Sequence, residues 1–506
     1  MIISLSVLVI TIIVSGTYAL YKAQLSKNIG VNTTTHGLAY YINYVKGTDI
    51  TAATLNPSTS YESGASSDIE FWKKDDSYDI YGKIDLTVNT IGTNLKNSPA
   101  LKYAVVNNGN VLSTGSLKGT TSGSKVTILK NLYLEQTKQI YTVYVWLDNS
   151  EELGNISNES LSISVDCTAS LQKEPAADTI ISLYTSAAKV TATNNSITYN
   201  TAPSVSLMND RLGGTTTSLD GGNIRYYGAS PNNYIYFNCS DYSNQTSSTC
   251  ETWRIIGVFD GKLKLIRGSQ IGKYSWDNKN ISTGAENNSG KNDWTTARLM
   301  KLLNPRDYYK VDSNDNNLGQ SLYYNSASGK CYSGQNNATV DCDFTSTGIK
   351  NDETRNMIAE TTYYLGGWNS YSVYPNEIYE YERGTTVYTG RPPTWPGKIA
   401  LAYPSDYGYA ADLNQCKDKT LYDYDNSTCT SNNWMKAILG TSSHGWLLTP
   451  RSSGSYNAWN VYSGGYVGST YLAYYAIGAV PVLSLSSKLG IESGDGSSSN
   501  PYKLSA

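Results

Sequence analysis

The chain has 506 residues, and its 39 basic and 42 acidic side chains leave a formal net charge of −3. This length is enough for about two or three domains. Charged residues make up only 16 % of the chain and form no basic stripe that would neutralise phosphates, which excludes nucleic acid as a partner. Tyrosine occurs 44 times and phenylalanine only 4 times, and this excess indicates a large, wet, β-rich surface because each tyrosine hydroxyl seeks water or a partner.

An apolar segment at residues 2–14 opens the chain and is followed by small residues up to Ala19. A short apolar run before small residues is typical of a signal peptide. Counted as far as Leu20, however, the segment approaches the length of a membrane helix. Both alternatives predict export, and we favour a retained membrane anchor at residues 1–22 over a cleaved signal.

Residues 28–168 are predicted to form an antiparallel β-sandwich. Apolar and polar residues alternate in short runs that Gly, Asn and Ser interrupt. The apolar members of these runs are Ile84, Leu86, Val88, Leu101, Tyr103, Val105, Tyr141, Val143, Val145, Leu147, Leu161, Ile163 and Val165. The segments SGTYA, LKYAVVNNGNVLSTGSL, ILKNLYL and IYTVYVWLDN resemble camelysin-like surface and biofilm-matrix sandwiches of Gram-positive bacteria. This resemblance implies a structural extracellular module.

Residues 169–224 are expected to connect the sandwich to a second domain. Apolar spacing predicts one helix at 176–189. The run at 191–222 is rich in Thr, Asn and Ser and cannot bury much apolar surface, so it is predicted to be loop or partly disordered.

The second domain is predicted to span 225–506. Residues 253–266 are expected to form a β-hairpin around a type I′ turn at Asp260-Gly261. Capping and stop signals predict three helices, at about 294–303 with Asp293 as the cap, about 351–365 and about 431–439. Long polar and aromatic loops are expected at 310–320 and 369–396.

The cysteines predict three loop disulfides. The pairs are Cys239 with Cys250, Cys331 with Cys342, and Cys416 with Cys429. None has the CxxC spacing of a zinc site, and the only histidines are His36 and His444, so no metal or cofactor is predicted. Each disulfide should contribute about 3 kcal/mol and indicates an oxidising, extracytoplasmic compartment. Cys167 is expected to be a buried small hydrophobic residue.

The stretch at 445–485 carries the strongest functional signal. Between two apolar strands, tyrosine and tryptophan alternate with Ser, Gly and Asn. This mixture is typical of recognition surfaces, where rigid amphipathic rings lie among adaptable hydrogen-bonding groups. We therefore predict a ligand-binding face made of Tyr456, Asn457, Trp459, Asn460, Tyr462, Tyr466, Tyr471, Tyr474 and Tyr475. The alternative is a set of tyrosines that pack locally over a small β-meander.

The motifs WLLTPR at 446–451, Gly464-Gly465 and AVPV at 479–482 follow a hairpin, helices and long loops. In this order they resemble the C-type-lectin-like fold of formylglycine-generating enzymes, of the variable proteins of diversity-generating retroelements and of gut bacterial surface domains. The resemblance implies a ligand-binding domain with its site between WLLTPR and AVPV. No cysteine follows Cys429 and no EPN or QPD occurs, so the chain departs from the enzyme branch and from calcium-dependent lectins. The expected fold class is β-rich α+β.

Other residues that are able to carry chemistry are interpreted as structural. His444 is expected to be a loop histidine without a catalytic role. The oxygen-rich run at 312–317 lacks the glycine and final glutamate of an EF-hand, so we expect a solvated loop rather than a calcium site. Asp406 is expected to cap a turn or helix. Buried polar pairs are expected at Arg254, Arg298 and Arg451.

No catalytic residue is predicted, because no GxSxG, HExxH, P-loop or dinucleotide-binding motif occurs in a fitting context. The favoured function is an exported cell-surface protein whose sandwich stalk presents an adhesion-type head that binds a glycan or another protein. Two alternatives stay open. One is a structural subunit of a pilus-like or biofilm fibre, and the other is a secreted glycan-active enzyme whose paired carboxylates meet only in space.

Overall fold

The computed structural model describes residues 23–24, 38–51, 55, 57–156, 159–211, 222–278, 288–310, 318–333, 338–441 and 444–505. Three features singled out in the sequence lie outside these ranges: the signal or anchor segment, His36 and the oxygen-rich run at 312–317. Within the described ranges, no helix is both long and apolar enough to cross a membrane.

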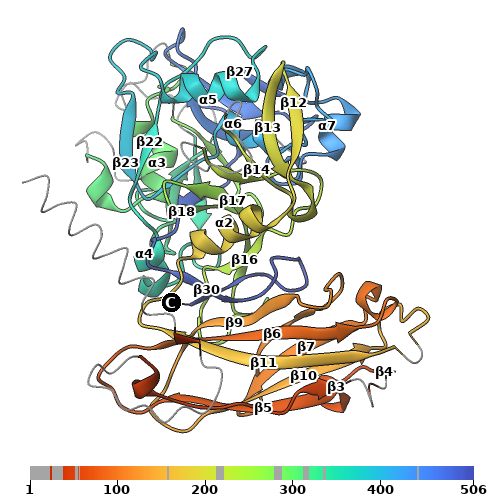
Figure 1. The fold of residues 1–506 in the computed structure, drawn as a ribbon. Helices are drawn as coiled ribbons and strands as arrows, with labels where there is room; N and C mark the ends of the chain where they lie inside the picture. Colours follow the sequence, from red (N-terminus) through yellow and green to blue (C-terminus); the bar gives the residue numbers. More distant parts are fainter. Residues whose placement is uncertain are drawn as a thin grey trace, which may run out of the picture. The chain divides into compact units, whose positions relative to one another are not determined.

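Contacts divide the chain into two compact units (Figure 1). The sandwich unit comprises Met1–Pro175, Gly490–Asp495 and Tyr502–Ser505, and the head unit comprises Ala176–Leu489 and Gly496–Pro501. The head unit thus takes in most of the segment expected to be a connector. The last hairpin, which the sequence places in the second domain, instead belongs to the sandwich unit.

Two sheets build the sandwich unit (Figure 1). The first has the order β1–β11–β6–β9, with β3 also on β11; its strands are Ala23–Gln24 (β1), Ile50–Thr51 (β3), Tyr81–Ile91 (β6), Lys125–Tyr133 (β9) and Leu161–Ser170 (β11). The second has the order β2–β5–β10–β7–β8; its strands are Ile42–Val45 (β2), Ala65–Lys73 (β5), Leu101–Asn107 (β7), Asn110–Ser116 (β8) and Ile140–Asp148 (β10), and Pro57–Ser58 (β4) pairs with β10.

Alternation along the strands explains the sandwich core. In β11 every second residue is buried and every residue between is half-buried, from Leu161 to Ser170. All thirteen alternating apolar residues predicted from the sequence are buried in one cluster. Because successive side chains of a strand point to opposite faces, this pattern places one face of each sheet in the core. Cys167 is free and buried in the same cluster, as predicted.

A C-terminal hairpin completes the sandwich unit. It consists of β30 (Gly490–Ser493) and β31 (Lys503–Ser505). Asn131, which has a φ of 53° at a bulge of β9, donates its amide N–H groups to Ile491 O and Glu174 O, each at 3.0 Å. Asparagine tolerates the left-handed region better than most residues, so this one side chain fixes both ends of the inserted head segment to β9.

The larger sheet of the head unit has the order β12–β13–β14–β15–β17–β18–β29–β24, with β16 on β17. Its strands are Val190–Asn194 (β12), Ile197–Ala202 (β13), Leu207–Asn209 (β14), Ile224–Tyr226 (β15), Tyr234–Phe237 (β16), Glu251–Phe259 (β17), Lys262–Arg267 (β18), Ile399–Ala400 (β24) and Val482–Ser484 (β29). Asp260 and Gly261 have φ values of 48° and 70°, which confirms the predicted primed turn between β17 and β18.

The prediction of loop or disorder at 191–222 is wrong for its described part, because β12, β13 and β14 lie there. Asn195 and Ser196, with φ values of 48° and 62°, form the tight turn between β12 and β13. Tyr199 and Met208 are buried against other head residues. Long-range packing of these few large side chains therefore outweighs the polar composition of the segment.

The helices are shorter and more numerous than predicted. They are Ala176–Ser186 (α2), Arg298–Leu303 (α3), Asp352–Met357 (α4), Pro375–Arg383 (α5), Pro404–Tyr409 (α6), Ser427–Ser431 (α7) and Lys436–Leu439 (α8). The first predicted helix is confirmed as α2. Asp293 caps a 3₁₀ turn, Trp294–Thr296 (η7), by accepting from Thr295 N–H at 3.1 Å, and α3 follows.

Two helix predictions and one loop prediction in the head unit need correction. The helix predicted at about 431–439 forms only at its end, as α8. The helix predicted at 351–365 ends at Met357, and the β-branched pair Thr361-Thr362 instead starts the strand Thr361–Tyr364 (β22), which pairs with Thr394–Gly397 (β23). The loop predicted at 369–396 contains α5. Proline at its first position and Glu377, which accepts from Tyr374 N–H at 2.9 Å, start that helix.

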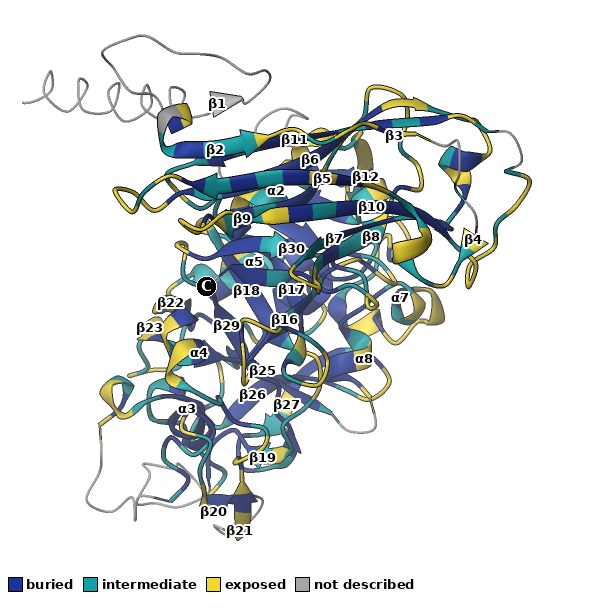
Figure 2. Cartoon of the chain, turned by 90° about the horizontal axis from the view of Figure 1, so that it is seen from below, coloured by how far each residue is buried: buried dark blue, intermediate teal, exposed yellow. Residues whose placement is uncertain are grey.

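A second sheet in the head unit has the order β19–β28–β25–β26–β27. Its strands are Lys273–Ser275 (β19), Gly445–Pro450 (β25), Asn457–Val461 (β26), Val467–Leu472 (β27) and Ala476–Gly478 (β28). A separate hairpin pairs Ser328–Tyr332 (β20) with Thr339–Asp343 (β21). Figure 2 shows β17, β18, β25 and β26 in the buried colour.

Three disulfides join the predicted cysteine pairs, all of them in the head unit. They link Cys239 to Cys250, Cys331 to Cys342, and Cys416 to Cys429. Each closes a local loop, which removes conformational freedom from the unfolded chain. Three such bonds indicate an oxidising environment.

Candidate functional site

The sheet of β25, β26 and β27 turns one face into the head core. Leu447, Trp459, Val461 and Val467 are fully buried there in one apolar cluster. The prediction that Trp459 faces a ligand is therefore wrong. Residues 459 and 461 point to the same side of β26, and that side is packed against the rest of the head unit.

Two asparagines of the predicted face are buried as well. Asn457 donates to Thr470 O at 2.9 Å and thereby braces β26 against β27. Asn460 lies opposite Trp446 of β25 and Gly468 of β27. Its side chain is fully buried, and neither its amide oxygen nor its amide nitrogen has a hydrogen-bond partner among the described residues. Neither asparagine is exposed as the sequence predicts, because every residue of β26 is buried, so both faces of this strand are covered.

The turn between β26 and β27 presents a stacked pair of rings. Tyr462 directly follows β26, Tyr466 directly precedes β27, and Gly465 N–H donates to Tyr462 O at 2.8 Å. Gly465 has a φ of 106°, a conformation that favours glycine. The two rings lie 4.1 Å apart at an angle of 15°. The Tyr462 hydroxyl also hydrogen-bonds the Thr470 hydroxyl at 3.1 Å, which fixes the ring over β27.

Seven tyrosines form an unbroken chain of ring contacts, which we call the tyrosine array. In order they are Tyr474, Tyr475, Tyr471, Tyr462, Tyr466, Tyr422 and Tyr371. Neighbouring centroids lie between 4.1 and 5.6 Å apart. Tyr474 is 9 % exposed, Tyr422 is 46 % exposed and the others are half-buried. Rings at such distances attract each other, so the array holds its own shape while every member except the buried Tyr474 stays partly accessible.

Five of the nine predicted residues therefore meet in the array, and two further tyrosines join them. Tyr422 lies in a 3₁₀ helix, Leu421–Asp423 (η10), and Tyr371 lies in the loop before α5. Leu421 N–H donates to Val373 O at 2.9 Å, which holds the two loops together. Tyr456, in contrast, lies half-buried at the other end of β26, where its carbonyl accepts from Ala473 N–H at 2.8 Å.

His444 contacts the centre of the array. Its ring lies 4.6 Å from Tyr462 and 5.0 Å from Tyr471. Its Nδ1 accepts from Ser463 N–H at 2.9 Å, so the proton of the neutral ring is on Nε2. Burial and the nearby Lys273 lower the pKa of His444, which keeps the imidazole uncharged near neutral pH. The residue lies in the loop before β25, where the sequence places it, and its ring packs against the array.

Three central tyrosine hydroxyls of the array stay protonated at neutral pH. Burial raises the pKa of Tyr462, Tyr466 and Tyr471, and neighbouring tyrosines raise it further. Each hydroxyl is therefore an uncharged donor and acceptor at neutral pH. The array combines ring surface with neutral hydrogen-bonding groups.

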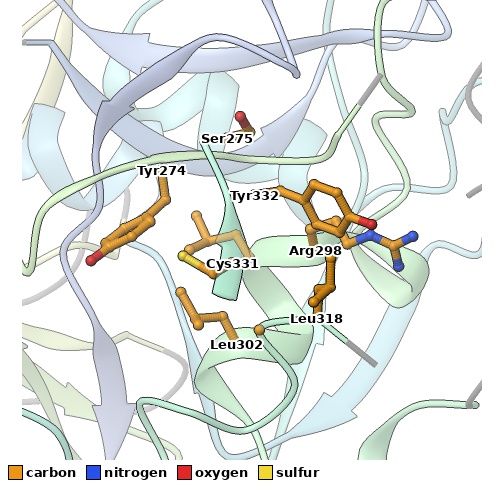
Figure 3. A pocket seen from close by; sticks show the side chains of 9 residues that line it. Tyr274, Ser275, Arg298, Leu302, Leu318, Cys331 and Tyr332 are labelled. Atoms are coloured by element: carbon orange, nitrogen blue, oxygen red, sulfur yellow. The ribbon is translucent and has the colours of Figure 1, made fainter. Parts of the chain in front are cut away.

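A small pocket elsewhere in the head unit is a weaker candidate site. It lies between β19, α3 and β20, and its cavity volume is only about 10 Å³. Figure 3 shows its lining residues, among them Tyr274, Arg298, Leu302, Leu318, Cys331 and Tyr332. This volume is about the size that one water molecule needs and is too small for an organic ligand. The Arg298 guanidinium lies 5.1 Å from the Tyr332 ring centroid and packs against the wall of the pocket.

A buried ionic cluster joins β14, β15, β18 and α6. Arg225 donates to Asp210 at 2.6 Å and to Asp406 at 3.0 Å, and Lys264 donates to the second oxygen of Asp406. Tyr403 N–H donates to Asp406 at 3.0 Å, which confirms the predicted capping role of this residue in α6. Burial raises the pKa of Asp406, but Lys264 and Arg225 outweigh burial and hold that pKa below its usual value.

Glu382 of α5 is a second buried carboxylate. It accepts from Ser405 N–H at 2.9 Å and from the Ser405 hydroxyl at 2.5 Å, and Arg383 lies 3.3 Å away. Burial raises the pKa of Glu382 to about 7. Both carboxylates of this region thus bind protein groups and are closed to solvent.

The three arginines predicted to form buried polar pairs differ from one another. Arg254 is buried and donates to Asn233 at 2.5 Å. Arg298 is buried beside the pocket described above. Arg451 is only half-buried and donates to Ser453 at 3.2 Å. All three arginines lie next to an apolar run in the sequence, but only two of them are buried. This sequence criterion therefore does not predict which arginine is buried.

Within the described part of the chain, no group of three or more His, Cys, Asp or Glu residues is arranged to hold a metal ion. Comparison with known proteins finds no family model that matches this chain and no curated protein that matches it.

Proposed function

We propose that this protein is an exported binding protein whose head unit holds a glycan at the tyrosine array. One observation carries the proposal: seven tyrosines from separate segments meet in one partly exposed chain of rings. A sugar ring has a face of C–H groups and a rim of hydroxyls. Tyrosine matches both, because its ring takes up the C–H face and its hydroxyl bonds the rim.

Export is supported by the disulfides, which persist in oxidising compartments. In this proposal the sandwich unit is a stalk, and residues 1–22 are the membrane anchor or signal. The resemblance of the head to C-type-lectin-like domains, carried by WLLTPR and AVPV, agrees with a binding role without calcium.

A non-catalytic role is supported by the buried carboxylates of the head unit. Glycoside hydrolysis needs two carboxyl groups on either side of a reachable bond. Glu382 and Asp406 are fully buried and occupied by Ser405, Arg383, Arg225 and Lys264. Their arrangement stabilises α5 and α6 against the larger sheet and offers no place for a substrate.

A glycan microarray probed with the complete protein tests the proposal. We expect binding to at least one glycan class, and loss of that binding in the double variant Tyr462→Ala/Tyr471→Ala, which removes the centre of the array. Tyr78→Ala is the matched control, because Tyr78 is a 45 % exposed tyrosine of the sandwich unit. Absence of glycan binding, or binding that survives the double variant, would contradict the proposal.

A further inference from the structure

The tyrosine array is a chain of contiguous rings. Its two ends, Tyr474 and Tyr371, are linked through five intermediate rings, and each step joins one ring to the next. A compact ligand is usually enclosed by a pocket. A row of similar side chains instead offers the same contact repeatedly, which matches a ligand that repeats the same chemical unit along its length.

The array is also electrically neutral along its length. Its central members are tyrosines whose pKa is raised, Tyr462, Tyr466 and Tyr471, and His444, whose pKa is lowered. Charged groups of both signs lie beside these residues: Asp425 packs next to Gly464, Lys436 packs next to Gly465, and Lys273 lowers the pKa of His444. Charges of both signs side by side favour neither a polyanion nor a polycation. The array therefore has no means of selecting a charged polymer.

A peptide fits this surface less well than a glycan. Extended peptides commonly bind by adding a strand to the edge of a sheet. β27 is the edge of its sheet, but η10 lies against it and contributes Tyr422 to the array. The accessible groups are thus rings and hydroxyls rather than backbone.

From these three observations we propose that the array binds a neutral, extended polysaccharide along its length, several sugar units at a time. This proposal rests on the proposed function. It adds that the ligand is uncharged, that it is extended and that it lies along the array. Tyr462 and Tyr471, with His444 between them, contact the central units. Tyr422 and Tyr371 contact the units toward one end, so they matter only for chains long enough to reach them.

Calorimetric titration of the complete protein with neutral oligosaccharide series tests this. The probes are cello-, xylo- and manno-oligosaccharides from the monosaccharide to the hexasaccharide, with oligogalacturonates of matching length as charged probes. For at least one neutral series we expect affinity to rise about tenfold from disaccharide to hexasaccharide, as added stacking contacts accumulate. We expect no change of that affinity with salt concentration, because a neutral ligand has no charge to screen.

Variants separate the ends of the array from its centre. Tyr422→Ala should lower the hexasaccharide affinity about tenfold and leave the disaccharide affinity unchanged, whereas Tyr422→Phe, which keeps the ring, should retain most of it. Tyr462→Ala should weaken both ligands. Tyr78→Ala in the sandwich unit should weaken neither.

The outcomes distinguish the two proposals. Binding of only charged or only short glycans, lost in the Tyr462→Ala/Tyr471→Ala variant, leaves glycan binding in place and overturns the neutral, extended ligand. Equal affinity for disaccharide and hexasaccharide overturns it too. No binding of any glycan by the complete protein overturns both proposals, and capture of a polypeptide at the array would assign the surface to a protein partner instead.

Discussion

The sandwich unit and the head unit bury their interiors by different means. In the sandwich unit, successive residues of β11 alternate between the core and the opposite face, and the core is mostly aliphatic. In the head unit, single polar side chains hold segments that are far apart in the sequence. Asn292 donates to the carbonyls of Arg451, Gly454 and Asn457, and Trp276 donates to Leu447 O at 3.2 Å.

This difference decides what a mutation can do in each unit. A core built from many small apolar contacts loses stability in proportion to the atoms removed. A core braced by buried charges and amides instead loses much when one partner is removed, because the other partner stays buried and unpaired. Four predictions, from the largest expected effect to the smallest, test this contrast.

The buried ionic cluster should be the most sensitive point of the head unit. Arg225→Met leaves the buried Asp210 without its cation, with only the N–H groups of Asn223 as partners among the described residues, and removes one of the two cations that bind Asp406. We expect a loss of about 3–5 kcal/mol in the free energy of unfolding of the head unit and no change in the sandwich unit. Urea unfolding followed by hydrogen exchange of peptides from each unit measures both.

Lys330→Met is the matched control for this variant. It breaks the exposed pair of Lys330 with Asp341 in the same unit and should cost less than about 1 kcal/mol. Equal costs for Arg225→Met and Lys330→Met would show that burial does not govern these pairs.

Reduction of the disulfides should affect the head unit alone. The double variant Cys416→Ser/Cys429→Ser opens one local loop and should destabilise the head unit by about 3 kcal/mol. Thermal unfolding with and without a reductant measures how much all three disulfides together stabilise the head unit. Cys167 is free and buried, so the melting of the sandwich unit serves as an internal control. A reductant that shifts both units equally would contradict the prediction.

Acidification should stabilise the head unit through Glu382. Burial raises the pKa of Glu382 from its usual 4.5 to about 7, so the folded state binds a proton more tightly than the unfolded state. The stabilisation that protonated Glu382 contributes is fully present below its pKa in the unfolded state. It is lost as the pH rises through its pKa in the folded state. We therefore expect a loss of about 2 kcal/mol between about pH 5 and pH 8.

Glu382→Gln should remove this slope, because glutamine does not titrate. Glu492 of the sandwich unit offers a parallel case, since burial raises its pKa to about 7 as well. Glu492→Gln should flatten the pH dependence of the sandwich unit only. Urea titrations at several pH values measure both slopes, and an unchanged slope in Glu382→Gln would refute the assignment.

The smallest effect is expected at Asn460. Its buried amide has no partner among the described residues, so Asn460→Ala should cost less than about 1 kcal/mol. Asn292→Ala removes an amide NH₂ group that lies within hydrogen-bond distance of three carbonyls and should cost several times more. Chemical denaturation of the two variants compares them directly. A similar cost for both would mean that Asn460 binds an ordered water or another group.

The sandwich strands were predictable because their signal is local. Residues two apart, such as Leu86 and Val88, share a face of a strand whatever the rest of the chain does. The primed turn at Asp260-Gly261 was predictable for the same reason. The strands at 190–209 were not, because Tyr199 and Met208 gain their burial from partners far along the chain.

The candidate site also has one part that was predictable from local sequence and one part that was not. The density of rings after Tyr462 indicated an aromatic surface, and Tyr462, Tyr466 and Tyr471 do meet. Composition could not show that Trp459 points into the core, since a strand presents its residues to both faces in turn. Tyr422 was missed because it reaches the array from a separate loop, which only the fold brings near.

Pro175 and Gly490 form an antiparallel bridge, so the chain enters and leaves the head at neighbouring points of the sandwich unit. The head is thus a domain inserted into the sandwich unit. A truncation after β11, the last strand of the two sandwich sheets, would therefore remove β30 and β31, which belong to the same unit. Because Pro175 and Gly490 touch, residues 176–489 can instead be excised and the gap sealed with a short linker, with residues 496–501 of the head unit kept as the loop between β30 and β31. Such a deletion keeps Ile491 within reach of Asn131 and leaves the module whole.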